Sequence, residues 1–138
     1  MGCIVRDHRG EVLLSAWRVL RNCATTEEAE AMACLEGVQL VREWIRKPTI
    51  IESDCACLIA SLLAPTADRG RCTYIYQEIK ACMILLPKVR IKKVRRECNR
   101  VAHELAQLAK RTEHCAVWRV SAPDCIRELL LNDCNYVP

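Results

Sequence analysis

The stretch GCIVRDHRG, residues 2–10, decides the fold because it predicts a β-hairpin. Residues 2–6 and residues 11–20 are both rich in Val, Ile, Leu and Trp, as β-strands commonly are. The polar segment between them, Asp7 to Gly10, ends in glycine and is typical of a hairpin turn. We therefore expect two antiparallel strands, with Asp7 shaping the turn between them.

A long amphipathic helix is predicted to follow this hairpin, over residues 26–46. Thr25 and Glu28 have the spacing of a capping box, in which the first residue caps the helix and the acid three residues later reaches back. Apolar and small residues then recur in steps of three and four residues, which is the spacing of one helical face. The residues of this stripe are Ala29, Met32, Ala33, Gly37, Leu40, Val41, Trp44 and Ile45.

The rest of the chain alternates between strand and helix patterns. Residues 49–54 form a short β-branched run that predicts a buried strand ending in Asp54. Val89 and Ile91 alternate with basic residues and predict another strand, in which the doubled Lys92-Lys93 indicates a bulge. The remaining patterns predict helices at residues 55–63, 73–86, 99–111 and 123–131, and a loop at 64–71. This order of elements predicts an α/β domain with a mixed sheet.

Length and composition indicate one ordinary globular domain over residues 1–138. Hydrophobic residues make up 51% of the chain and charged residues 28%, so a disordered chain is not indicated. The longest apolar runs are too short to span a bilayer. Residues 1–7 lack the apolar region of a secretory signal. We therefore expect an intracellular protein, cytoplasmic or nuclear, that is not secreted and has no membrane partner.

The 11 cysteines raise the question of a zinc site or a disulfide framework. Their number is odd, and the closest pair, Cys55 and Cys57, lacks the two-residue separation of a zinc knuckle. Cys3, Cys34 and Cys82 lie where strand or helix patterns place a small hydrophobic residue. This distribution favours reduced, buried thiols.

A basic run, KVRIKKVRRECNR, covers residues 88–100 and contains only one acid, Glu97. Such a cluster suits the phosphates of a nucleic acid. The residues alone favour this interpretation and a simply solvated face about equally.

Five segments of the chain resemble, in order, the ribonuclease H domain of plant retroelement reverse transcriptases. They are GCIVRDHRG at residues 2–10, AEAMACLEG at 29–37, IIESDC at 50–55, VRRECNRVAHELAQLA at 94–109 and VWRVSAPDCIRELLLND at 117–133. Any one of them is a weak signal, but five in family order are a specific one. The resemblance extends over nearly the whole chain and also covers domesticated relatives of the retrotransposon enzymes.

This resemblance implies a ribonuclease H-like mixed sheet flanked by helices. It also implies that the first central strand of the family is missing, because that strand precedes the hairpin with which this chain begins. We expect the resulting gap to expose sheet edges that promote self-association. The implied function is the endonucleolytic cleavage of RNA in RNA–DNA hybrids, a hydrolase reaction supported by two Mg²⁺ ions.

The resemblance also assigns the site residues. Glu30 and Asp54 match two of the four metal-binding acids of the family, the first acid is absent, and His103 matches the last. A neutral imidazole is a poor ligand for Mg²⁺ but a possible one for Mn²⁺. Taken alone, His103 is somewhat more consistent with a structural histidine, Asp54 with a helix N-cap, and Glu30 with a solvated acid in a helical first turn. Cleavage is therefore expected to be impaired, and a catalytically inactive binding module or a retroelement remnant are the alternatives.

The same segments place the basic residues beside the site. By resemblance, the contacts to an RNA–DNA hybrid or another duplex come from Lys92, Lys93, Arg95, Arg96 and Arg100. Asn99 is expected to cap the helix that carries His103.

Overall fold

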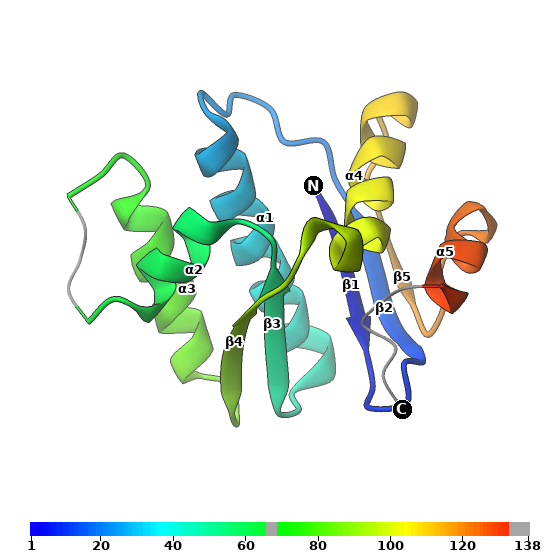
Figure 1. Ribbon diagram of the computed structural model, residues 1–138, viewed down its shortest axis with the longest axis horizontal. Coiled ribbons are helices and arrows are strands. Elements are labelled where there is room, and N and C mark those ends of the chain that lie inside the picture. The colour runs from blue at the N-terminus through cyan, green and yellow to red at the C-terminus, as the bar shows by residue number, and fades with distance from the viewer. Residues whose placement is uncertain (66–68, 133–138) are drawn as a thin grey trace. The chain divides into compact units, whose positions relative to one another are not determined.

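The computed structural model describes residues 1–65 and 69–132. In this part of the chain, helices flank strands of both orientations, and the expected α/β fold class is confirmed. The chain forms two compact units, each with its own strands and helices (Figure 1). Unit 1 consists of residues 1–21 and 95–138, and unit 2 consists of residues 22–94. The single domain expected from the chain length stays a prediction.

The sheet of unit 1 has the strand order β1-β2-β5. β1 (Gly2–Arg6) pairs antiparallel with β2 (Val12–Trp17), so the predicted hairpin is confirmed. β5 (Ala116–Arg119) pairs antiparallel with the other side of β2. The sequence analysis did not predict β5.

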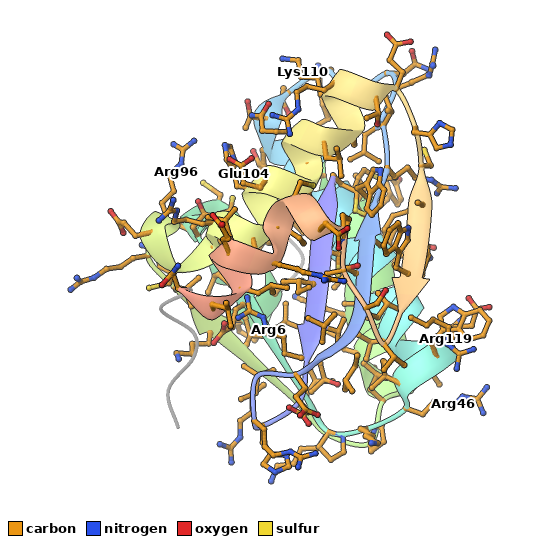
Figure 2. All side chains as sticks on the ribbon, turned by 90° about the vertical axis from the view of Figure 1, so that its right-hand side faces the viewer. Arg6, Arg46, Arg96, Glu104, Lys110 and Arg119 are labelled. Atoms are coloured by element: carbon orange, nitrogen blue, oxygen red, sulfur yellow. The ribbon has the colours of Figure 1, made fainter. Side chains whose placement is uncertain are left out.

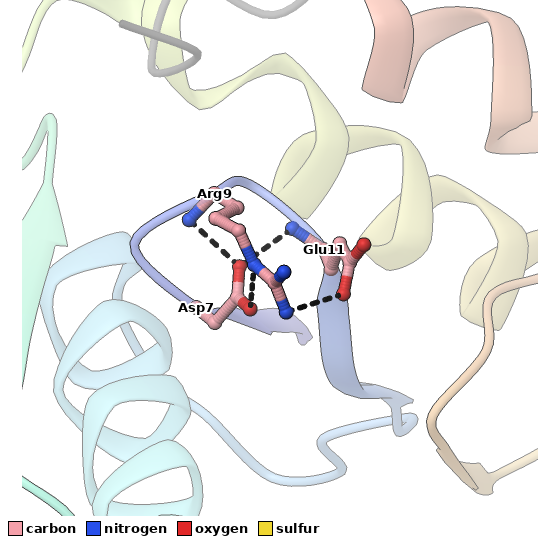
Figure 3. Close-up of polar contacts among 3 residues, drawn as sticks. All are labelled: Asp7, Arg9 and Glu11. Carbon is pink, nitrogen blue, oxygen red and sulfur yellow. Dashed lines mark hydrogen bonds and ion pairs between the residues drawn. The ribbon is translucent and has the colours of Figure 1, made fainter. Parts of the chain in front are cut away.

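The hairpin turn is held by the carboxylate of Asp7, as the sequence predicted (Figure 3). One carboxylate oxygen accepts hydrogen bonds from the backbone N–H groups of Arg9, at 2.8 Å, and of Glu11, at 2.9 Å. The Arg9 guanidinium lies 3.5 Å from the carboxylates of both Asp7 and Glu11. Desolvation alone would raise the pKa of Asp7, but these hydrogen bonds and the positive charge of Arg9 outweigh it and lower the pKa.

The main helix of unit 1, α4 (Arg100–Thr112), packs against β1 and β2. Its buried residues, Val101, Leu105 and Ala109, recur every four residues and so lie along one face. They form a core cluster with Trp17 and Ile126. Three short helices complete the described part of unit 1: η2 (Arg96–Asn99), η3 (Asp124–Ile126) and α5 (Arg127–Leu131).

Unit 2 begins with α1 (Thr26–Leu40), whose N-terminus is capped as predicted. Thr25 Oγ1 accepts a hydrogen bond from the N–H of Glu28 at 3.1 Å, and the Glu28 carboxylate accepts one from the N–H of Ala24 at 2.8 Å. The expected apolar stripe is in part wrong, because the buried residues of α1 are Ala31, Leu35 and Val38.

The predicted helix over residues 26–46 does not stay α-helical to its end. It continues from α1 as one turn of π-helix, η1 (Val41–Ile45), in which the N–H of Arg46 donates to the carbonyl of Val41 at 2.9 Å. Arg46 then ends the helix in the left-handed conformation, with φ of 51°. Trp44, expected in the apolar stripe, is 44% exposed.

Two parallel strands form the sheet of unit 2, β3 (Thr49–Ser53) and β4 (Val89–Lys93). α2 (Ala56–Leu63) contacts both strands, and α3 (Thr73–Ile84) packs along α1. These boundaries agree with the predicted strands and helices to within about two residues, as is normal for assigned ends. Residues 66–68 of the predicted loop lie outside the described part of the chain.

Several local predictions are corrected by the structure. The register between β3 and β4 continues without a shift through Lys93, so Lys92-Lys93 is not a bulge, and the irregularity lies instead in the β1–β2 hairpin between Val5 and Arg6. Asn99 occupies the N-cap position of α4, but its side chain makes no capping hydrogen bond. The predicted helix over residues 123–131 begins as the separate 3₁₀ turn η3.

The described cysteines form no disulfide with one another. Cys82 is buried, as the helical pattern around it predicted, while Cys3, Cys34 and Cys55 are only partly buried. Burial raises the pKa of the Cys3 thiol to about 11, which keeps that thiol protonated at neutral pH.

In unit 1, β1 has a strand on one side only among the described residues. The backbone groups of Met1 and Arg18 are hydrogen-bonded to each other in both directions. Because backbone groups alternate in direction along an antiparallel strand, the N–H and C=O groups of Cys3 and Val5 also point toward β2. The same groups of Gly2 and Ile4 point to the opposite edge.

In unit 2, β3 also has one edge without a described partner. Thr49 N–H donates to the Lys88 carbonyl at 2.8 Å, and Ser53 C=O accepts from Val94 N–H at 3.0 Å. Because backbone groups alternate along a strand, those of Ile50 and Glu52 point away from β4.

None of the described helices is long and apolar enough to cross a membrane.

Candidate nucleic-acid interface

Asp54 lies at the point where the chain leaves β3 for α2. The Ser53 hydroxyl, on a nearly buried residue, accepts a hydrogen bond from the N–H of Cys55 at 3.1 Å and so shapes this turn. Ser53 is opposite Lys93 in the parallel register, so Asp54 follows the same sheet edge at which β4 ends. The N-cap of α2 is Cys55, which corrects the alternative role of Asp54 as that cap.

Glu30 lies in the first turns of α1, five residues after the capping residue Thr25. Glu30 is half-buried and, like Asp54, belongs to unit 2. Neither residue is part of a group of three or more His, Cys, Asp or Glu side chains that could hold a metal ion, since the described residues contain no such group. The pair of magnesium ions that the resemblance implies stays a prediction.

On β4, the predicted contact residue Lys92 already has an acidic neighbour. Its Nζ lies 3.4 Å from Oε1 of Glu52, which is directly opposite in the parallel register. The Lys92 side chain is 64% exposed, so the ion pair reduces its charge only in part. Lys93, the next residue, is exposed.

Three of the predicted basic residues lie at the start of α4, in unit 1. Arg95 precedes η2, Arg96 opens η2, and Arg100 is the first residue of α4. All three are exposed, and within the described part of the chain none of them forms an ion pair. Figure 2 shows Arg96 at this end of α4 and Lys110 at the other end. The positive charge of the three guanidiniums adds to that of the helix N-terminus.

His103 lies on the exposed side of α4 and belongs to unit 1. It sits between the buried residues Val101 and Leu105, two residues from each, which places its side chain on the far side of the helix from the core. Its Nε2 is 3.5 Å from the side-chain nitrogen of Gln107, one turn later. The imidazole is thus a surface group that remains accessible to a ligand or to solvent.

Sequence reasoning missed the role of Glu52. The ion pair with Lys92 depends on the parallel register of two strands that are far apart in the chain, and no local pattern reveals that register. The only available signal was an acid, Glu52, two residues before Asp54 in a predicted strand.

The mixed α/β fold is consistent with the ribonuclease H-like class. A comparison with protein families matches residues 1–109 to the family described as reverse transcriptase-like. Because the match covers most of the 138 residues, the chain belongs to the reverse transcriptase-like family. The matched range contains Glu30, Asp54 and His103 and ends before β5. A comparison with curated proteins found no match.

Proposed function

We propose that this chain is a ribonuclease H-like domain that binds the backbone of an RNA–DNA hybrid or another duplex and has little or no cleavage activity. The observation that carries the proposal is the group of three exposed arginines, Arg95, Arg96 and Arg100, at the start of α4. No described acid forms an ion pair with them, so their charge remains available to phosphate.

Guanidinium groups are suited to this contact because each can donate two parallel hydrogen bonds to phosphate oxygens. Backbone contacts fix the position of a protein on a duplex without reading its base sequence, and the shape of the helix and the sugar hydroxyls then distinguish a hybrid from DNA. Lys92 and Lys93 on β4 would add to the attraction in unit 2, with Lys92 weakened by Glu52.

The residues of this chain support the cleavage reaction of the family less well than they support nucleic-acid binding. Hydrolysis at two metal ions needs several oxygen ligands, and only Glu30 and Asp54 match acidic positions of the family. His103 offers a nitrogen atom in place of a carboxylate, which favours Mn²⁺ over Mg²⁺. The second candidate function, an active hybrid endonuclease, is favoured by the position of Asp54 directly after the carboxyl end of β3, where α/β sheets place their sites. Descent from a plant retrotransposon stays a prediction.

Binding can be tested by following the fluorescence anisotropy of a labelled RNA–DNA hybrid over a series of salt concentrations. The double variant Arg95→Ala/Arg96→Ala is compared with Lys110→Ala/Arg111→Ala, which removes the same charge from the last turn of α4. If the two arginines contact phosphate, the slope of log affinity against log salt falls by about 2 for the first variant, since each contact contributes about 0.9. The control keeps the wild-type slope. Equal slopes for both variants and the wild type would overturn the proposal.

A further inference from the structure

Unit 2 contains an open cavity of about 700 Å³ between the end of the α1–η1 helix and the end of α3. We call it the α1–α3 cavity. One wall carries Arg42, Glu43 and Arg46, and the other carries Leu85, Leu86 and Pro87. Its volume lies in the range of cavities that hold a small ligand or a few side chains of a partner.

The π-helical turn of η1 builds the charged wall. Arg42 and Arg46 both line the cavity, and the Nε of Arg46 donates to the carbonyl of Arg42 at 3.2 Å. This bond fixes the direction of the Arg46 side chain, while its terminal nitrogens keep their donors. Figure 2 shows Arg46 projecting away from the ribbon.

Positive charge dominates the surroundings of the cavity. Lys47 and Lys88 are exposed, and the backbone bond between Thr49 and Lys88 holds the two segments next to each other. Glu43 is the one acid among the described residues that line the cavity. In the described part of the chain, neither of the lining arginines forms an ion pair.

The opposite wall is aliphatic and partly accessible. Leu86 is 7% exposed and forms the packed part, whereas Leu85 is 65% exposed. Ile84, just before it in the chain, is 82% exposed. The exposed Leu85 side chain and the two arginines line the same cavity, which indicates a surface that can bind a partner with both kinds of group.

We propose that the α1–α3 cavity binds an acidic peptide segment that carries a bulky aliphatic side chain. Its carboxylates would pair with Arg42 and Arg46, and its aliphatic side chain would cover Leu85. A nucleic acid fits this surface less well, because no described aromatic residue lines the cavity to stack a base. The proposal does not depend on the proposed nucleic-acid interface, since the cavity lies beside the first residues of β3 and β4, and Asp54 follows the last residue of β3.

The test uses the full chain and a fluorescein-labelled peptide rich in Glu and Asp with a central pair of Leu residues. The variant Arg42→Gln/Arg46→Asn removes both charges while keeping a good helix former and a residue that tolerates the left-handed conformation. We expect saturable binding to the wild type and an affinity loss of about tenfold or more in the variant, from two charge-assisted contacts. Lys110→Gln/Arg111→Asn, with the same charge change in α4, is expected to bind the peptide as the wild type does.

A second variant tests the aliphatic contact. Leu85→Ser is expected to weaken binding of the Leu peptide but not of a peptide in which Ser replaces both Leu residues. Binding of the RNA–DNA hybrid is measured for the same proteins and should be unchanged in all cavity variants. No saturable peptide binding, an unchanged affinity in Arg42→Gln/Arg46→Asn, or a loss of hybrid binding in place of peptide binding would each overturn the proposal. Circular dichroism confirms that every variant compared is folded.

Discussion

Gly2 in β1 lies directly against Ala102 in α4, with no room for a side chain between them. A Cβ atom at Gly2 would collide with the carbonyl oxygen of Ala102 and lie 2.6 Å from the backbone nitrogen of Ala106. These neighbours are backbone atoms of a helix and cannot move aside without shifting α4. This contact explains why the strand and the helix of unit 1 pack so closely.

We therefore predict that Gly2→Ala destabilises the protein by about 1–3 kcal/mol, the usual cost of forcing extra atoms into a packed interior. Urea unfolding followed by circular dichroism measures the change. Lys93→Ala, at an exposed position, serves as the control and is expected to stay within about 0.5 kcal/mol of the wild type. A Gly2→Ala protein as stable as this control would show that α4 can shift without cost.

A second prediction concerns the hydrogen bond between α3 and α1. The Tyr76 hydroxyl donates to Oε1 of Glu27 at 2.7 Å, and Tyr76 is 6% exposed. Tyr76→Phe leaves the ring in place and removes the donor, so we expect a loss of about 1.5–3 kcal/mol, the range for a bond to a charged group. The double variant Tyr76→Phe/Glu27→Gln should lose less stability than the sum of the two single changes, and additive losses would mean that the two groups do not interact.

The same pair gives a third prediction, on alkaline pH. Burial, and then the hydrogen bond to Glu27, raise the pKa of Tyr76 above its ordinary value of 10.0. Folding thus favours the neutral phenol, and this contribution is fully present below the unfolded pKa and is lost as pH rises toward the higher folded value. The wild type should lose stability above about pH 10 more steeply than Tyr76→Phe does. Parallel curves for the two proteins would contradict the assignment.

A fourth prediction concerns the open edge of β1. Gly2 and Ile4 direct backbone groups to a side of unit 1 on which no described strand pairs, and each unpaired buried group costs about 1–3 kcal/mol against a total of about 5–15 kcal/mol. An added N-terminal strand of the family type, bearing an aspartate, is expected to raise the melting temperature and reduce self-association. Sedimentation velocity and thermal melting compare the two forms. A 138-residue chain that melts cooperatively as a monomer at the same temperature as the extended form would refute this.

The fifth prediction concerns cleavage. We expect little or no hydrolysis of an RNA–DNA hybrid in Mg²⁺, with Mn²⁺ as the more favourable ion, because a nitrogen ligand at His103 stands where the family has an acid. Hybrid cleavage is followed on a denaturing gel. Magnesium-dependent cleavage near the rate of an intact family member, abolished by Asp54→Asn, would show that the two carboxylates suffice.

The elements that local sequence determines were predictable. The hairpin at Asp7 and the cap at Thr25 are confirmed because each depends on hydrogen bonds between residues at most four apart. β5 was missed because only its first residue is partly buried and the others are exposed, so the strand carries no alternation of apolar and polar residues. Its position is fixed by pairing with β2, which is distant in the sequence.

The candidate site, too, was predictable only where local sequence or the family resemblance determines it. The positions of Glu30, Asp54 and His103 followed from the family resemblance, and the strand and helices that carry them were expected from local patterns. The ion pair between Lys92 and Glu52 was not predictable, because a strand pattern does not tell which strand will lie beside it or in what register.

The π-helical turn of η1 contains one residue more than an α-helical turn, so the charged wall of the α1–α3 cavity depends on the number of residues between α1 and β3. The N–H of Arg46 reaches back five residues to Val41, one more than in an α-helix. Deleting a single residue between Val41 and Arg46 would allow ordinary α-helical bonding, in which Arg46 donates to the same carbonyl of Val41 over four residues. Arg46 and the residues after it would keep their direction around the helix axis, while the wall of the α1–α3 cavity would lose one residue. Among relatives, a segment shorter by one residue should therefore change which side chains form the charged wall without displacing β3.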